Sequence, residues 1–186
     1  MSSKDKGSKD FDAFVKRQQP TAAEPKPIDW EKRRDEWLQH LEELYEQVES
    51  FLDEYLKSGN IKREYRETML NEEYIGTYKA REMVLKIGRQ EITLTPIGTL
   101  IIGARGRVDV VGPAGKTRFV LVNSELSKPS ITVTFRFAGE PNPPAPEAIA
   151  KEIKWAWKIP TSPPTIRYTE LTRDSLFEVL MEVTNG

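Results

Sequence analysis

The longest regular pattern in the chain is a series of apolar side chains at three- and four-residue steps between residues 29 and 58. This spacing is typical of an amphipathic α-helix, because each turn brings the chain back to the same face. Asp29 can cap its start, and Gly59 with Asn60 can end it in the left-handed conformation. The face is too broad for a coiled-coil seam, which favours packing on the chain's own sheet, with dimerisation as the alternative. Its members are Trp30, Trp37, Leu38, Leu41, Leu44, Tyr45, Val48, Phe51, Leu52 and Tyr55.

From residue 83 onward the pattern changes to short β-branched and aromatic runs bounded by glycine and proline, which predicts strands. The runs lie at 83–87, 91–95, 99–103, 107–111, 117–122, 130–137, 153–159 and 166–169. The segment 61–73 has the composition of a helix, but its apolar residues show no regular spacing. The sequence therefore does not decide between helix and strand there.

The C-terminus again has the helical pattern. Thr172 can cap a last helix over 173–183, with Leu176, Phe177, Leu180 and Met181 on one side. We therefore predict an α+β fold in which a long N-terminal amphipathic helix packs on a curved antiparallel sheet or small barrel, followed by a C-terminal helix. This single domain would span 28–186, mainly β over 83–170.

Residues 1–27 are polar and proline-containing, which predicts a disordered N-terminal arm. Within it Phe11, Phe14 and Val15 would share one face of a short helix. Such an apolar island is a candidate partner-binding motif. The alternative is a passive tail, because short apolar clusters carry little specificity.

The stretch VVGPAGKT, residues 110–117, resembles a phosphate-binding loop of the form G-x-x-x-x-G-K-[ST]. However, Val110 occupies the place of the first glycine, and a β-branched run follows Thr117 where a helix should start. We therefore interpret the stretch as a β-hairpin turn, with Pro113 in a type I turn and Gly115 in the left-handed region.

Basic residues gather around this hairpin, namely Arg105, Arg107, Lys116 and Arg118. Asp109 would face Arg118, or lie diagonal to it, and neutralise part of the patch. Residues 59–125 carry eleven Lys and Arg against eight Asp and Glu, an excess too small for strong phosphate tracking. The helix over 29–58 is acidic, so we expect its charge to complement that of the sheet, within one chain or between copies.

Ile153, Trp155, Trp157 and Ile159 alternate with Lys154 and Lys158. The tryptophans could form a stacking surface for single-stranded nucleic acid or a sugar. Because isoleucines share their face, we favour the interpretation that the indoles are core and the lysines face solvent.

Composition narrows the chemistry further. The chain has 186 residues, a net charge of −1, no cysteine and one histidine, His40. Cysteine-ligated metals, thiol catalysis and histidine-based triads therefore lack their residues, and we predict no catalytic, metal or cofactor site. No apolar run is long enough for a membrane span and no signal peptide is recognisable, so we expect a cytoplasmic protein without membrane contact.

Three functions remain in order of preference. The first is a non-catalytic protein–protein interaction or accessory protein that binds another protein or a second copy of itself, with Phe11, Phe14 and Val15 and the four basic residues as candidate contacts. The second is a nucleic-acid-associated module that uses the local basic face. The third, a carboxylate-dependent hydrolase, ranks last because no pair of acids stands out.

Overall fold

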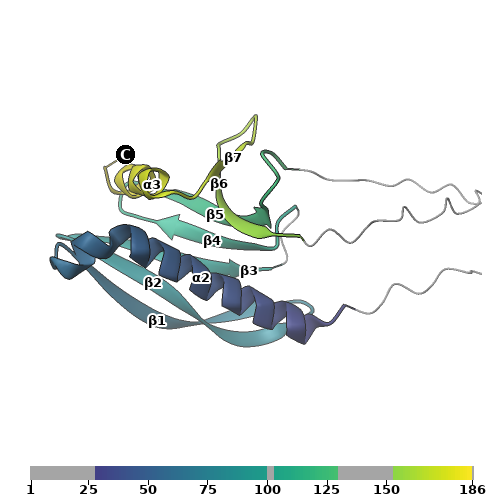
Figure 1. Ribbon diagram of the computed structural model, residues 1–186. Helices are drawn as coiled ribbons and strands as arrows, with labels where there is room; N and C mark the ends of the chain where they lie inside the picture. Colours follow the sequence, from purple (N-terminus) through teal and green to yellow (C-terminus); the bar gives the residue numbers. More distant parts are fainter. Residues whose placement is uncertain (1–27, 100–102, 130–152, 186) are drawn as a thin grey trace, which may run out of the picture.

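The computed structural model describes residues 28–99, 103–129 and 153–185. It confirms an α+β fold, in which one open, entirely antiparallel sheet has the strand order β1-β2-β3-β4-β5-β6-β7 (Figure 1). The two helices contact each other and share one apolar core with the sheet. The elements are α2 (Trp30–Lys57), β1 (Ile61–Glu72), β2 (Gly76–Ile87), β3 (Gln90–Gly98), β4 (Gly106–Val111), β5 (Lys116–Asn123), β6 (Trp155–Pro160), β7 (Tyr168–Glu170) and α3 (Arg173–Asn185).

Helix α2 follows its sequence pattern closely. The Asp29 side chain caps it by accepting a 2.9 Å hydrogen bond from the Lys32 backbone N–H. Gly59 adopts the expected left-handed conformation at φ 76°, whereas Asn60 does not, since no described residue other than glycine has a positive φ. The fully buried part of its apolar face comprises Trp37, Leu41, Leu44, Tyr45, Val48 and Leu52. The ends of the stripe, Trp30 and Tyr55, are only partly covered.

The ambiguous segment 61–73 forms the edge strand β1, which pairs with β2 in an unbroken register from Ile61–Ile87 to Glu72–Gly76. Its long charged side chains suggest a helix by composition, yet they pair across the sheet instead. Glu67 lies 3.0 Å from Lys79, and Glu64 lies 2.7 Å from Lys86. Charged residues are also what protects an edge strand from pairing with other chains.

The prediction of a strand at 99–103 is wrong at residues 99 and 103, the two ends of this range that the structure describes. Strand β3 ends at Gly98, where the register shifts, and Gly98 and Gly103 have φ values of 130° and 79°. These conformations bend the chain out of the sheet. Residues 100–102, and the strand expected at 130–137, lie outside the described residues.

The stretch VVGPAGKT is a hairpin, as expected. It joins β4 to β5, and Asp109 stands directly opposite Arg118. Gly115 does not have the left-handed conformation expected of it. The constrained glycine is instead Gly112, where a Cβ would lie 2.9 Å from the carbonyl carbon of Val183 and closer still to its oxygen. The Ala114 N–H also donates to that oxygen at 2.9 Å, so the turn is docked on the end of α3.

Helix α3 has the expected N-cap, because the Ser175 N–H donates to the Thr172 hydroxyl at 3.2 Å. Leu176 and Leu180 are buried as predicted, but Met181 is 58% exposed. Five residues beyond Leu176 a helix has turned roughly 140° away from the buried stripe, which is why position 181 faces outward. Within the described part of the chain no helix is long and apolar enough to cross a membrane.

Candidate functional site

Strand β6 has a partly unpaired edge. On one side it pairs with β5 from Val120 to Asn123. On the other side the short strand β7 covers only Lys158, Ile159 and Pro160. Within the described ranges no strand pairs with Trp155–Trp157 on that second side. This short stretch therefore offers backbone groups to an additional strand.

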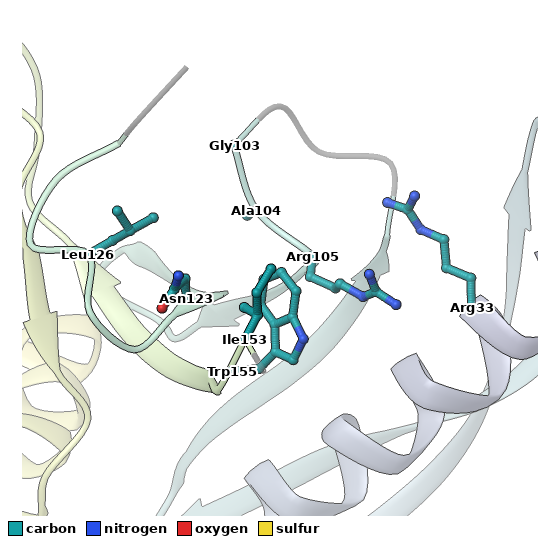
Figure 2. Close-up of a pocket in the computed structure, with 8 residues that line it drawn as sticks. All are labelled: Arg33, Gly103, Ala104, Arg105, Asn123, Leu126, Ile153 and Trp155. Atoms are coloured by element: carbon teal, nitrogen blue, oxygen red, sulfur yellow. The ribbon is translucent and has the colours of Figure 1, made fainter. Parts of the chain in front are cut away.

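Trp155 lines two hollows of similar size, one on the β5 side of β6 and one on the side of its open edge. The first has a volume of about 300 Å³ (Figure 2). It is lined by Arg33, Gly103, Ala104, Arg105, Asn123, Leu126, Ile153 and Trp155. The second has a volume of about 310 Å³ and is lined by Glu43, Gln47, Trp155, Ala156, Trp157, Lys158, Glu170 and Leu171.

In the first hollow, Arg105 lies between Trp155 and Arg33 (Figure 2). Its guanidinium carbon is 5.2 Å from the centre of the indole ring, within the range of a cation–π interaction. It also forms an ion pair with Glu36 of α2, and its backbone N–H donates to the Leu121 carbonyl at 2.7 Å. The position of this cation is therefore set by both the helix and the sheet.

Arg33 is held from the opposite side of the hollow. One guanidinium nitrogen donates to the Thr99 carbonyl at 3.1 Å, while its buried Nε has no hydrogen-bond partner. Thr99 is fixed in turn by the buried carboxylate of Glu72, which accepts from the Thr99 N–H at 2.7 Å and hydroxyl at 2.9 Å. Glu72 thus positions Arg33 through Thr99.

The Glu72 carboxylate also accepts a hydrogen bond from the hydroxyl of Tyr78, which lies on β2 close to the β1–β2 turn. Burial and this hydrogen bond to Glu72 raise the pKa of Tyr78, so the phenol stays protonated and remains a donor. Gly98 permits the arrangement, because a Cβ there would stand 2.8 Å from the Glu72 carboxyl carbon. Nothing in the sequence pattern distinguished Glu72 or Arg33, which both look like residues of solvated faces.

The second hollow carries a net negative charge, because Glu43 and Glu170 outnumber Lys158, whose ammonium lies 3.9 Å from the Glu170 carboxylate. Glu170 is largely exposed, and Glu43 contacts His40, whose Nδ1 lies 2.8 Å from its carboxylate. Gln47 closes one wall by donating to the Leu171 carbonyl at 3.1 Å. The two hollows on either side of Trp155 therefore carry opposite charge.

The tryptophans divide between core and site. Trp157 is core as expected, with its indole N–H donating to the His40 carbonyl at 3.0 Å. Trp155 is only half-buried and Ile153 is 53% exposed, so the expectation that this whole face is core is wrong at its open end. The apolar core on this face of the sheet therefore ends between Trp157 and Trp155.

Lys158 was expected to face solvent but is 5% exposed. Its ammonium donates to the carbonyls of Ser124 at 2.7 Å and Leu126 at 2.9 Å. These hydrogen bonds offset the cost of burying the charge. Alternation alone could not predict this, since the covering loop is remote in sequence.

The four predicted basic residues do not form one surface. Arg105 lines the first hollow, whereas Arg107, Lys116 and Arg118 line a different cleft. Acidic side chains of α2 form ion pairs with basic side chains of the sheet and of α3 in the same chain. Pairing within one chain is one of the two arrangements that we expected, the other being pairing between copies. The pairs are Glu36–Arg105, Glu42–Arg81, Glu49–Arg63 and Glu54–Arg173. Phe11, Phe14 and Val15 lie outside the described residues.

No group of three or more potential metal ligands occurs among the described residues. Comparison with known proteins places the chain in no family: no family model, curated protein or solved structure matches it.

Proposed function

We propose that this chain is a non-catalytic protein–protein interaction module that binds an extended segment of a partner protein along the open edge of β6. One observation carries the proposal: the stretch Trp155–Trp157, whose second side is paired with no described strand, lies between two hollows of opposite net charge. An added strand would form main-chain hydrogen bonds with this edge, which supply affinity, while its side chains enter the hollows, which supply specificity.

The lining residues support a peptide as the ligand. Tryptophan and arginine are the side chains most enriched where protein interfaces gain their binding energy, and here Arg105 is already stacked on Trp155. Arg33 and Arg105 favour a carboxylate in the first hollow, and Glu43 and Glu170 favour a cation in the second. The expected segment therefore has an apolar residue with an acidic residue on one side and a basic residue on the other.

Selection from a displayed random-peptide library tests the proposal. We expect enriched peptides with that charge order, and we expect Trp155→Ala to weaken their binding at least about tenfold, because truncating a tryptophan that is a binding hot spot costs about 2 kcal/mol or more. Amide chemical-shift changes on titration should centre on Ala104, Asn123 and residues 155–157. The matched control is Tyr55→Ala, which removes a partly exposed aromatic that contacts Phe177 elsewhere.

A charge-reversal pair sharpens the test. The Arg105→Glu protein should no longer bind peptides that carry the acidic residue. It should bind them again when the acidic residue of the peptide is changed to lysine. Peptides that bind the Trp155→Ala protein undiminished, or shifts that lie away from β6, would refute the site. A single-stranded oligonucleotide that competes for Trp155 at low salt would favour the nucleic-acid alternative instead.

We further propose that residues 1–27, through Phe11, Phe14 and Val15, are a separable contact. The described core cluster runs from Trp37 to Val183, and α2 begins at its own cap, Asp29. Deleting residues 1–27 should therefore leave the melting temperature within a few degrees, measured by circular dichroism, while reducing capture of a partner found by the peptide selection. Unfolding of the truncated chain would show that the arm belongs to the fold, and equal capture would show a passive tail.

A further inference from the structure

A third cleft, independent of the β6 edge site, lies beside the β4–β5 hairpin. Its volume is about 150 Å³, and β4 contributes Arg107 and Asp109 to its lining. β5 contributes Lys116, Thr117 and Arg118, and the segment after β6 contributes Pro160, Thr161, Ser162 and Pro163. Adjacent strands thus bring the cations to one place, since Asp109 stands opposite Arg118 in the register.

The cleft holds three cationic groups against one carboxylate. Asp109 is engaged by Arg107, which donates to its two oxygens at 2.6 and 2.9 Å. This ion pair orients the Arg107 guanidinium and neutralises the charge of the Asp109 carboxylate. Lys116 and Arg118 have no ion-pair partner in the described part of the chain. Positive charge is therefore left over in the cleft, and it is not matched by the protein itself.

The wall formed by the segment after β6 is fixed by hydrogen bonds. The Thr161 N–H donates to the Arg167 carbonyl at 2.9 Å, and the Arg167 N–H donates to the Thr161 hydroxyl at 2.9 Å. That hydroxyl donates in turn to the Thr165 carbonyl at 2.9 Å. Ser162 follows directly and also lines the cleft, so this wall is already ordered. A preformed wall lowers the ordering cost of binding a ligand.

We propose that this cleft binds a compact oxyanion, a phosphate or sulfate group, through Lys116, Arg118 and the outer edge of Arg107. Proteins bind such anions with the guanidinium groups of arginine and the ammonium groups of lysine. An arginine that is already held by an ion pair has its free N–H groups in a fixed position for the anion. The cleft, with its volume of about 150 Å³, has room for a tetrahedral anion. This binding mode differs from a phosphate-binding loop, because side chains rather than curled backbone N–H groups would hold the anion.

Titration of the isotope-labelled full chain with inorganic phosphate, at constant ionic strength, tests the proposal. We expect saturable shifts confined to residues 107–118 and 160–163, including the Nε–H signals of Arg107 and Arg118. The double variant Lys116→Gln/Arg118→Gln should weaken phosphate binding at least about tenfold. Phenyl phosphate in a parallel titration distinguishes a site for the free ion from one for the group on a larger molecule, and binding of either supports the proposal.

The control is Lys62→Gln/Lys79→Gln, which removes the same charge from β1 and β2 and should leave phosphate binding unchanged. If the double variant does not fold, Lys116→Gln alone carries the test, since Lys116 is exposed. Shifts spread over surface cations without saturation would overturn the proposal, as would unchanged binding by Lys116→Gln or a stronger response to Lys62→Gln/Lys79→Gln. Tighter, salt-dependent binding of an oligonucleotide than of phenyl phosphate would assign the cleft to a nucleic-acid backbone and also overturn it.

Discussion

Replacing Gly112 with alanine should destabilise the protein by about 2–3 kcal/mol, whereas Gly115→Ala should change stability by less than about 1 kcal/mol. At Gly112 the new Cβ would lie 2.9 Å from the Val183 carbonyl carbon, so the turn and the end of α3 must separate. Their separation also costs the hydrogen bond from the Ala114 N–H to the Val183 oxygen. At Gly115 nothing stands within 4 Å of the corresponding position, and φ is not positive.

Thermal unfolding of the two variants measures this difference. For a chain of this length, the expected loss at Gly112 corresponds to a melting temperature lowered by roughly 5–10 °C. Amide hydrogen exchange should be faster along α3 in Gly112→Ala and unchanged in Gly115→Ala. Equal melting temperatures would show that the hairpin turn does not depend on its contact with α3.

Replacing Glu72 with leucine should destabilise the protein by about 3–5 kcal/mol. The substitution removes the acceptor of the Thr99 N–H, the Thr99 hydroxyl and the Tyr78 hydroxyl, all in the interior. Each buried donor left without a partner costs about 1–3 kcal/mol, which the added apolar contact of leucine only partly offsets. Glu67→Leu on the same strand is the matched control, since Glu67 is exposed and should change stability by about 0.5 kcal/mol or less.

Denaturant unfolding of both variants gives the two values, and peptide binding gives a second readout. Because Thr99 holds Arg33, Glu72→Leu should also weaken binding of the acidic end of a selected peptide in protein that remains folded. Tyr78→Phe removes only one of the three donors and should be milder. If Glu72→Leu were as stable as Glu67→Leu, the buried carboxylate would have no structural role.

Sequence periodicity predicted the elements that are held by nearest neighbours along the chain. Asp29 caps α2 and Thr172 caps α3, and both helix starts were predictable because a cap and an apolar face act within a few residues. The hairpin at residues 110–117 was equally predictable, because a missing glycine and a following β-branched run exclude the phosphate-binding loop. Strand β1 was not, since its charged side chains match helix composition and only pairing with β2 makes it a strand.

The sites illustrate the same division. The sequence by itself determined that the chain forms an acidic amphipathic helix, a mainly β region with a cluster of cations around one hairpin, and a capped final helix. Only the tertiary structure decided that Arg105 belongs with Trp155 while Lys116 belongs with Arg118, that Lys158 is buried, and that Gly112 rather than Gly115 is constrained. The physical reason is range: caps, turns and periodicity act over a few residues, whereas burial, ion pairing and close backbone approach depend on segments that folding brings together from distant parts of the chain.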